Sequence, residues 1–287
     1  MQKGGKKRPL RKPQRQNKPG IESRMTPEPQ ATTPGPGSGK LTDKVALITG
    51  GDSGIGRAVA VLFAKEGAKV AIAYLSEHAD AKETQNLVEA EGGECLLLPG
   101  DLSKEANCKR LVSKVIKKFG RIDVLVNNAA VHYEQKTLED ITSEQLLKTF
   151  ATNIFSYFWV TQAALPAIPE GGCIINTASV TAYRGSPSLI DYASTKGAIV
   201  SFTRSLASNL VKRKIRVNGV APGPVWTPLI ASTFKPEKVS NFGSDVPMER
   251  AGEPAEIAPA FLFLAASDGA YVTGQFIHVN GGEIVNG

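Results

Sequence analysis

The 287-residue chain is predicted to fold as a single α/β domain of the Rossmann type, with a doubly wound, seven-stranded parallel sheet and helices on both faces. Two observations lead to this class. From Leu41 onward, short apolar runs rich in Val, Ile and Leu alternate with longer amphipathic stretches, a pattern typical of parallel strands joined by crossover helices. The first apolar run leads directly into a glycine-rich turn, as in folds that bind a dinucleotide beyond their first strand.

The expected elements alternate along the chain as a doubly wound sheet requires. The apolar runs predict strands at 45–49, 69–74, 94–99, 124–127, 172–177, 216–221 and 275–279. The amphipathic stretches predict helices at 54–66, 79–91, 104–119, 143–165, 190–212 and 254–266. Right-handed crossovers would then place ligand chemistry at the carboxyl ends of the strands.

Residues 1–40 form an N-terminal tail whose composition differs from that of the domain at 41–287. The tail holds ten Lys or Arg and two Glu, whereas the domain holds 24 basic and 25 acidic residues and is near neutral. The tail is rich in Pro, Gly, Gln and Lys and has no apolar run, so it is expected to be disordered on its own. Its Pro-rich composition favours an extended form, which predicts packing across a neighbouring subunit.

Composition also excludes several functions. No apolar core of a signal peptide follows the basic start, and no apolar run is long enough to span a bilayer, so a cytoplasmic location and no membrane association are expected. The three cysteines and three histidines are scattered without metal-ligand spacing. Neither a disulfide nor a metal site is therefore expected.

The glycine-rich turn is the first candidate site. The strand predicted at 45–49 is followed at once by Gly50-Gly51-Asp52-Ser53-Gly54-Ile55-Gly56 and then by a helical pattern. Glycines let the main chain approach a ligand closely, and the start of the helix offers unpaired N–H groups to a pyrophosphate. The spacing G-x-x-x-G-x-G differs from the common G-x-G-x-x-G. Its position after the first strand nevertheless predicts a dinucleotide site.

Further candidates follow the ends of the later strands, in chain order. They are Tyr74 after the second strand, Asp101 and Leu102 after the third, Asn127 and Ala129 at the fourth, Ser179 after the fifth, and Pro222, Gly223, Val225 and Thr227 after the sixth. Asn153 lies inside the helix predicted at 143–165, where a buried amide needs partners. The irregular stretch 228–250, within a segment of about 224–250, is the expected substrate lid.

Tyr192 and Lys196 are four residues apart in the helix predicted at 190–212, so both side chains can point into one pocket. A tyrosine phenol has a reference pKa of about 10 and is a poor acid or base at neutral pH unless its anion is stabilised. The lysine charge is expected to lower the pKa of Tyr192. The pair therefore predicts general acid/base chemistry at the oxygen of an alcohol or carbonyl compound.

Together these motifs resemble the short-chain dehydrogenase/reductase family over essentially all of residues 41–287. The resemblance rests on Thr49-Gly50-x-x-x-Gly54-x-Gly56, Asn127-Asn128-Ala129, Asn153, Ser179, Tyr192-x-x-x-Lys196 and Pro222-Gly223 through Thr227. Ala130 stands where the family commonly has Gly, a departure that removes no catalytic group. The tail motifs Lys18-Pro19-Gly20-Ile21-Glu22 and Met25-Thr26-Pro27 are similar to the bacterial subgroup named after glucose and ribitol dehydrogenases.

The resemblance implies an NAD(P)-dependent oxidoreductase that transfers a hydride between the nicotinamide and a small alcohol or carbonyl substrate, such as a sugar, polyol, ketone or aldehyde. Tyr192 would exchange a proton with the substrate oxygen, and Ser179 would hydrogen-bond the same oxygen. Lys196 would bind the nicotinamide ribose. Asn153 would hold a water that connects the lysine to solvent.

The resemblance also implies the cofactor contacts. Thr227 and the backbone near Val225 would fix the nicotinamide carboxamide, Asp101 and Leu102 would contact adenine, and Asn127 would line the groove. The glycine turn, Tyr74, Ala129, Pro222 and Gly223 complete the expected binding set.

The cofactor choice depends on the residues near the adenosine ribose. Tyr74-Leu75-Ser76, at the end of the second strand, offers neither an acid for the ribose hydroxyls nor a base for a 2′-phosphate. Asp52 would repel a phosphate, and Arg57 lies one step beyond the turn, where it can be directed elsewhere. NAD(H) is therefore slightly favoured, with NADP(H) as the other candidate.

Two alternative functions stay open at this point. A 3-oxoacyl thioester reductase would use the same catalytic residues. A noncatalytic dinucleotide-binding scaffold, whose basic tail binds a polyanion, is an alternative of another class, although no specific nucleic acid is expected as a partner. The family resemblance further implies a homotetramer, with one symmetric contact at the apolar stretch 274–282.

Overall fold

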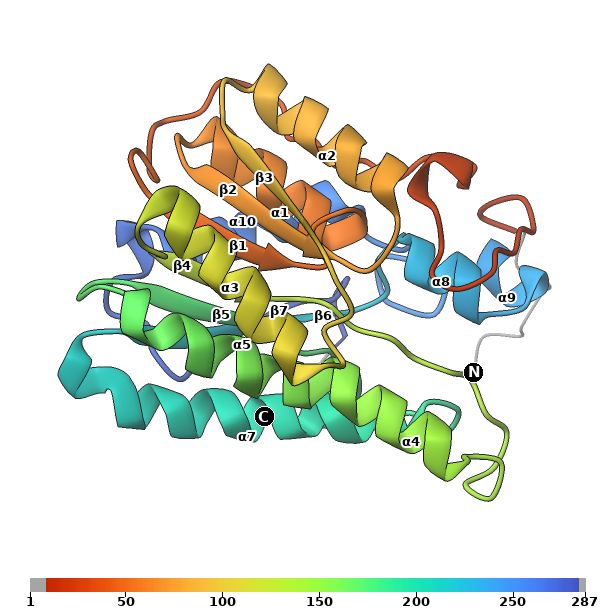
Figure 1. Ribbon diagram of the computed structural model, residues 1–287. Helices are drawn as coiled ribbons and strands as arrows, with labels where there is room; N and C mark the ends of the chain where they lie inside the picture. The colour runs from red at the N-terminus through yellow and green to blue at the C-terminus, as the bar shows by residue number, and fades with distance from the viewer. Residues whose placement is uncertain (1–8, 284–287) are drawn as a thin grey trace.

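Seven parallel strands form one open sheet in the computed structural model, which describes residues 9–283 (Figure 1). The strands are β1 (Val45–Thr49), β2 (Lys69–Tyr74), β3 (Cys95–Pro99), β4 (Val124–Asn127), β5 (Cys173–Thr177), β6 (Arg216–Pro222) and β7 (Phe276–Val279). Their order is β3-β2-β1-β4-β5-β6-β7, and every neighbouring pair is parallel. The predicted sheet is confirmed, and its order reverses between β1 and β4, where such folds bind their ligands.

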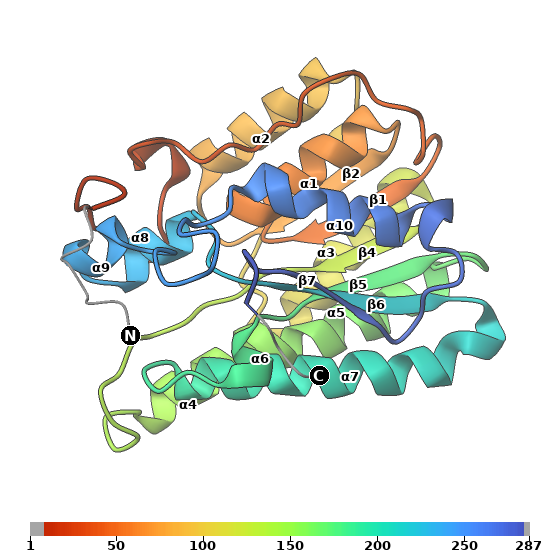
Figure 2. The same cartoon turned by 180° about the vertical axis from the view of Figure 1, so that it is seen from behind.

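Helices cover both faces of this sheet. The longer ones are α1 (Gly54–Lys65), α2 (His78–Ala90), α3 (Glu105–Phe119), α4 (Ser143–Phe150), α5 (Ser156–Ala164), α7 (Ile190–Leu210) and α10 (Pro254–Ala265). Figures 1 and 2 show α1 and α10 on one face, with α2 beside α1, and α3, α5 and α7 on the other. The layers are those of a doubly wound fold.

Burial on both faces explains why the strands are apolar along their whole length. Every residue of β1 is buried, and so is every residue of β2 after Lys69. One apolar cluster joins the sheet to α1 and α10 and includes Phe63 and Phe261, and a second on the opposite face includes Leu111 of α3. Such two-sided burial produces near-continuous apolar runs instead of an alternating pattern.

Two predicted elements differ from the structure. The helix expected at 143–165 is divided into α4 and α5 by a π-helical turn, η2 (Ala151–Phe155), a feature that often occurs at functional sites. The stretch at 228–250, expected to be irregular, contains α8 (Pro228–Thr233) and α9 (Pro236–Ser240). Each of these begins at a proline, whose fixed φ suits the first turn of a helix.

Several short helices complete the fold. They are α6 (Thr181–Arg184), η1 (Glu22–Arg24), η3 (Leu165–Ala167), η4 (Val211–Arg213) and η5 (Ser267–Gly269).

Residues 9–40, here called the N-terminal segment, lie against the domain to which they are joined (Figure 2). The segment lies beside α8 and α9 and then crosses α10 and α1 before it enters β1 (Figures 1 and 2). For these residues the expectation of disorder was wrong, whereas packing on a neighbouring subunit stays a prediction. The other part of the predicted tail, residues 1–8, lies outside the described residues.

The segment is attached by a few specific contacts instead of by an apolar run. The backbone N–H of Gln16 donates to the carbonyl of Ala231 in α8 at 2.9 Å. The indole N–H of the fully buried Trp226 donates to the carbonyl of Pro27 at 2.8 Å. Composition could not reveal this attachment, because the partners lie about two hundred residues away in sequence.

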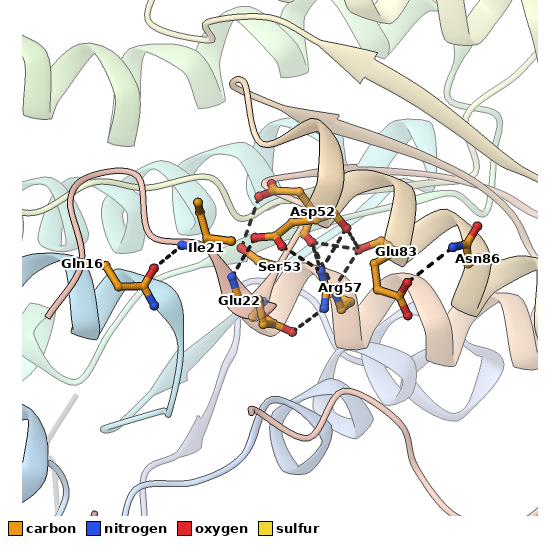
Figure 3. A network of polar contacts seen from close by, with 11 residues as sticks. Gln16, Ile21, Glu22, Asp52, Ser53, Arg57, Glu83 and Asn86 are labelled. Atoms are coloured by element: carbon orange, nitrogen blue, oxygen red, sulfur yellow. Dashed lines mark hydrogen bonds and ion pairs between the residues drawn. The ribbon is translucent and has the colours of Figure 1, made fainter. Parts of the chain in front are cut away.

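A buried ion pair ties the N-terminal segment to the glycine turn (Figure 3). The Glu22 carboxylate lies 2.8 Å from Nη1 of Arg57, and both side chains are almost completely buried. The same carboxylate accepts a hydrogen bond from the backbone N–H of Gly54, the first residue of α1. The backbone N–H of Glu22 donates to the Asp80 carboxylate at 2.7 Å, and Arg57 Nη2 donates to the carbonyl of Asp52 at 2.8 Å.

This arrangement predicts a large loss of stability in Glu22→Ala. Burial raises the pKa of Glu22 to about 7, while the Arg57 charge and the Gly54 N–H oppose the rise. Removing one partner of a buried ion pair leaves the other charge uncompensated, so the free energy of unfolding should fall by about 3–5 kcal/mol. Urea denaturation at neutral pH measures the loss.

Glu28→Ala is the matched control, because Glu28 is an exposed glutamate of the same segment. Its free energy of unfolding should change by less than about 0.5 kcal/mol. Equal stabilities of the Glu22 and Glu28 variants would contradict an anchoring role for Glu22.

Candidate functional site

A cavity of about 1030 Å³ opens at the carboxyl edge of the sheet, where the strand order reverses. Most of the predicted site residues line it, from all parts of the chain. They are Gly50, Asp52, Ser53, Gly54, Ile55, Tyr74, Asp101, Leu102, Ala129, Ser179, Tyr192, Lys196, Pro222, Gly223, Val225 and Thr227. The cavity is large enough for a dinucleotide together with a small substrate.

The glycine turn needs its glycines for steric reasons. Gly50 and Gly54 have φ values of 63° and 53°, in the left-handed region that favours glycine. A Cβ at Gly56 would lie 1.9 Å from the carbonyl oxygen of Gly50, so no larger residue fits there. Asn128 holds the turn from the side of β4, since its Nδ2 donates to the carbonyls of Thr49 and Gly50, each at 3.1 Å.

The three central candidates of the predicted catalytic set meet at one end of the cavity. Tyr192 and Lys196 come from α7, and Ser179 follows β5. Lys196 is almost fully buried, its Nζ donates to the carbonyl of Thr177 at 2.7 Å, and it lies 5.4 Å from the centre of the Tyr192 ring. The spacing of four residues therefore places both groups on the same face of the helix, as predicted.

The pKa of Tyr192 differs from the expectation. Burial raises it to about 12, and only a hydrogen bond with Ser179 lowers it. Burial also lowers the pKa of Lys196 to about 7. The expected depression of the Tyr192 pKa is therefore absent, because the loss of hydration of the phenolate outweighs its stabilisation by the Ser179 hydrogen bond. At neutral pH Tyr192 is a phenol.

Asn153 is buried behind the catalytic groups, in the π-helical turn η2. Its carboxamide makes paired 2.8 Å hydrogen bonds with the backbone N–H and carbonyl of Val131 and donates to the hydroxyl of Thr195 at 3.2 Å. Thr195 in turn donates to the carbonyl of Tyr192 at 2.7 Å. The side chain thus fixes the backbone beside Tyr192, and its expected role in holding water stays a prediction.

Three predicted residues do not line the cavity: Gly56, Asn127 and Asn153. Asn127 was expected in the cofactor groove, but it is fully buried, and its Nδ2 donates to Asn176 at 2.9 Å and to Thr161 at 3.2 Å. Side chains alternate across a strand, so Asn127 points into the layer of α5, and its neighbour Asn128 faces the glycine turn.

The end of the cavity beside the glycine turn is acidic. Asp52, Ser53, Tyr74 and Glu77 line it, and burial raises the pKa of Asp52 to about 6. The Tyr74 hydroxyl is 3.0 Å from Nδ1 of His78. Arg57 is the basic residue closest in sequence to the turn. Its guanidinium donates hydrogen bonds to the Glu22 carboxylate and the Asp52 carbonyl, and it does not line the cavity.

Close packing fixes the segment after β6. A Cβ at Gly223 would lie 2.7 Å from the Cα of Asn280, and Val225 makes an isolated parallel bridge with Gly252. The side chain of Thr227 contacts the glycine turn, because a Cβ at Gly54 would lie 3.0 Å from its Cγ2.

Three polar residues of the cavity were not predicted from the sequence. They are Lys18, His132 and Tyr133, which line the cavity together with Phe234. The His132 ring is buried and packs edge-on against the Tyr192 ring with centroids 5.0 Å apart. The position of His132, a few residues after the Asn127 motif, was its only signal in the sequence. Lys18 belongs to a tail motif noted above, but nothing in that motif indicated a place in the cavity.

Residues 9–283 contain no group of three or more His, Cys, Asp or Glu side chains able to hold a metal ion. Within the same range, no helix is both long and apolar enough to cross a membrane.

Comparisons with known proteins agree with this architecture. The family model described as enoyl-(acyl carrier protein) reductase matches residues 50–283. The chain is 54% identical to NADPH-dependent aldehyde reductase 1, chloroplastic, of Arabidopsis thaliana, over 93% of this chain and 96% of that protein. It is 52% identical to the glucose and ribitol dehydrogenase of Daucus carota, over 96% and 97% of the two chains.

Solved structures show the same likeness. A short-chain dehydrogenase from Burkholderia cenocepacia in complex with NADP superposes with a TM-score of 0.80 at 30% identity, covering 85% of this chain and 98% of that one. The family model covers most of the chain, and the relatives and the solved structure match it over most of their length. The chain therefore belongs to the short-chain dehydrogenase/reductase family, whose members are oxidoreductases.

Proposed function

We propose that the chain is a nicotinamide-dependent reductase of a small aldehyde or ketone, with Tyr192 as its general acid. The observation that carries this proposal is the meeting of Tyr192, Ser179 and Lys196 at one end of a cavity whose other end is a glycine turn. Aldehyde reductase and sugar or polyol dehydrogenase activities in the names of relatives belong to the same reaction class.

The residues present fit a dinucleotide. Gly50 and Gly54 line the cavity in backbone conformations that favour glycine, and the N-terminus of α1 would hold the pyrophosphate. Lys196 would bind the nicotinamide ribose, and Thr227 with the Val225 backbone would hold the carboxamide. When bound, the reduced cofactor supplies the hydride.

The proton for the carbonyl oxygen would come from a side chain of the protein. Tyr192 is a phenol at neutral pH, because burial raises its pKa to about 12. It would donate its proton to the carbonyl oxygen as negative charge develops there, while the Ser179 hydroxyl donates a second hydrogen bond to the same oxygen. This protonation state favours reduction over alcohol oxidation.

We propose that both NAD(H) and NADP(H) bind. Relatives include an enzyme named as NADPH-dependent and a structure in complex with NADP, so the slight preference for NAD(H) predicted from the sequence finds no support among them. Asp52 and Glu77 at the ribose end would weaken, without abolishing, binding of the 2′-phosphate.

A 3-oxoacyl thioester reductase stays the alternative reading. Apolar side chains of Leu189, Phe234 and Phe242 line the substrate end and would suit an acyl chain. Acetoacetyl thioester, added to a panel of aldehydes, ketones and sugars, separates the two readings by relative kcat/KM.

We further propose a homotetramer in the cytoplasm. The edge strand β7 is only partly buried, and the exposed Phe155 and Phe158 leave an apolar surface beside α5. Light scattering at micromolar concentration should give four times the chain mass, and a monomer would reject the assembly.

Tyr192→Phe should lower kcat for carbonyl reduction by about two to four orders of magnitude, because the general acid is removed while the ring is kept. NADPH binding, followed by fluorescence titration, should change by less than about threefold. A near-normal turnover would remove Tyr192 from its proposed role. Tyr133→Phe is the matched control, since Tyr133 lines the same cavity without a proposed proton transfer.

Alcohol oxidation should be strongly pH-dependent. The phenolate form of Tyr192 is needed to accept the alcohol proton, and its fraction rises about tenfold per pH unit below a pKa of about 12. The kcat/KM for oxidation should therefore climb steeply from about pH 7 to 10, whereas that for reduction should show no such rise. A flat oxidation profile would mean that Tyr192 is not the base.

Glu77→Gln should shift cofactor preference toward NADP(H). Removing one negative charge from the ribose end should improve the ratio of NADPH to NADH affinity by about 3- to 10-fold, the size of a partly screened charge interaction. Titration of both reduced cofactors measures this ratio. An unchanged ratio would show that Glu77 does not face the 2′ position.

A further inference from the structure

We propose that Lys18, brought into the cavity by the N-terminal segment, binds an anionic group of the carbonyl substrate, a carboxylate or a phosphate. The inference rests on the proposed reductase function and names the substrate class of the same site. Lys18 belongs to the N-terminal segment and not to the domain at 41–287. Its contact with the substrate would therefore add to the contacts that the proposed catalytic residues make.

The position of Lys18 connects it to the catalytic end of the cavity. Lys18, Pro19 and Gly20 line the cavity that also holds Tyr192. The Lys18 ammonium donates to the hydroxyl of Thr233 at 2.5 Å, and this hydroxyl is 3.3 Å from the carbonyl oxygen of His132. The His132 ring in turn packs against Tyr192. Lys18 is thus linked to Tyr192 through Thr233 and His132.

The backbone holds Lys18 firmly in this place. A Cβ at the neighbouring Gly20 would lie 2.4 Å from the carbonyl oxygen of Pro228, so the segment packs directly on the start of α8. The Lys18 Nζ also lies 5.0 Å from the centre of the Tyr133 ring, a cation–π distance. Glu22, four residues on, anchors the segment to the glycine turn.

The charge of Lys18 is not neutralised within the described residues. Two other lysines at the cavity have carboxylate partners: Lys148 lies 3.5 Å from Asp101, and Lys238 lies 2.7 Å from Glu134. Among residues 9–283 no carboxylate pairs with Lys18, whose one hydrogen-bond acceptor is Thr233. An ammonium has three donors, so two remain for a ligand.

This unpaired ammonium is largely buried, which makes an anionic ligand favourable. Burial lowers the pKa of Lys18 to about 8, so at neutral pH most of it is still charged. A charge taken out of water without a partner is costly, and a substrate anion would remove that cost through charge-assisted hydrogen bonds.

A second, independent observation points to a ligand at this end. His132 is 3% exposed, and its Nδ1 has no hydrogen-bond partner among the described residues. Burial, followed by the charges of Lys18, Lys196 and Lys238, holds the pKa of His132 well below its usual value. The ring is therefore neutral, and its buried Nδ1 lacks the hydrogen-bond partner that a buried polar atom usually has.

Matched pairs of substrates test the proposal. The first pair is 4-oxobutanoate and butanal, which differ by a carboxylate, and the second is glyceraldehyde 3-phosphate and glyceraldehyde, which differ by a phosphate. The readout is kcat and KM for NADPH oxidation at pH 7. The wild type should prefer the anionic member of at least one pair, and the pair with the larger preference tells carboxylate from phosphate recognition.

Lys18→Met keeps the aliphatic stem and removes the charge. It should lower kcat/KM for the preferred anion by about 10- to 100-fold, mainly through KM, which corresponds to the loss of a charged hydrogen bond. Neutral substrates should change by less than about twofold. Lys18→Arg should retain most of the preference, and Lys12→Met, at an exposed lysine of the same segment, should have no effect.

Several results would overturn the inference. A wild type that reduces neutral aldehydes but shows no preference for either anion leaves the proposed function intact and removes the role of Lys18. Equal losses for anionic and neutral substrates in Lys18→Met indicate a structural role only. Failure of the wild type with every aldehyde, despite NADPH binding, would instead refute the proposed function. If Lys18→Met does not fold, the wild-type preference and Lys18→Arg decide the question.

Discussion

Close backbone packing at the glycine turn is the constraint on which the site depends. A Cβ at Gly56 would lie 1.9 Å from the carbonyl oxygen of Gly50. The glycine turn and α1 therefore meet at a distance that only glycine allows. Asn128 holds the turn from β4, and the Glu22–Arg57 pair holds it from beneath. Strand, helix and N-terminal segment thus converge on a few residues at the switch point of the sheet, where the cavity opens.

The N-terminal segment joins the two ends of this cavity. Glu22 contacts the turn where the dinucleotide is proposed to bind, and Lys18 reaches Thr233 of α8, where the substrate is proposed to bind. Glu22 is fully buried and Lys18 is half-buried, and taking a charge out of water is unfavourable unless the group finds a partner. Arg57 supplies that partner for Glu22, and we have proposed that substrate supplies it for Lys18.

Much of the fold and of the cavity lining could be predicted, because both depend on local patterns. Continuous apolar runs defined the seven strands, and the spacing of Tyr192 and Lys196 placed both on one face of α7. Contacts between distant segments could not be predicted: the attachment of Pro27 to Trp226, the burial of Glu22 and the orientation of Asn127 away from the cavity depend on tertiary packing. The pKa of Tyr192 was predicted in the wrong direction, because the degree of burial, which decides it, is not visible in a helical spacing.

A crystal structure of the protein with bound NADP and a nonreactive carbonyl analogue tests the proposed catalytic arrangement most directly. This arrangement places the pyrophosphate at the N-terminus of α1, and the analogue's oxygen within about 3 Å of both the Tyr192 and Ser179 hydroxyls, with the nicotinamide beside it. A dinucleotide bound outside this cavity, or a nicotinamide ring directed away from Tyr192, would contradict it.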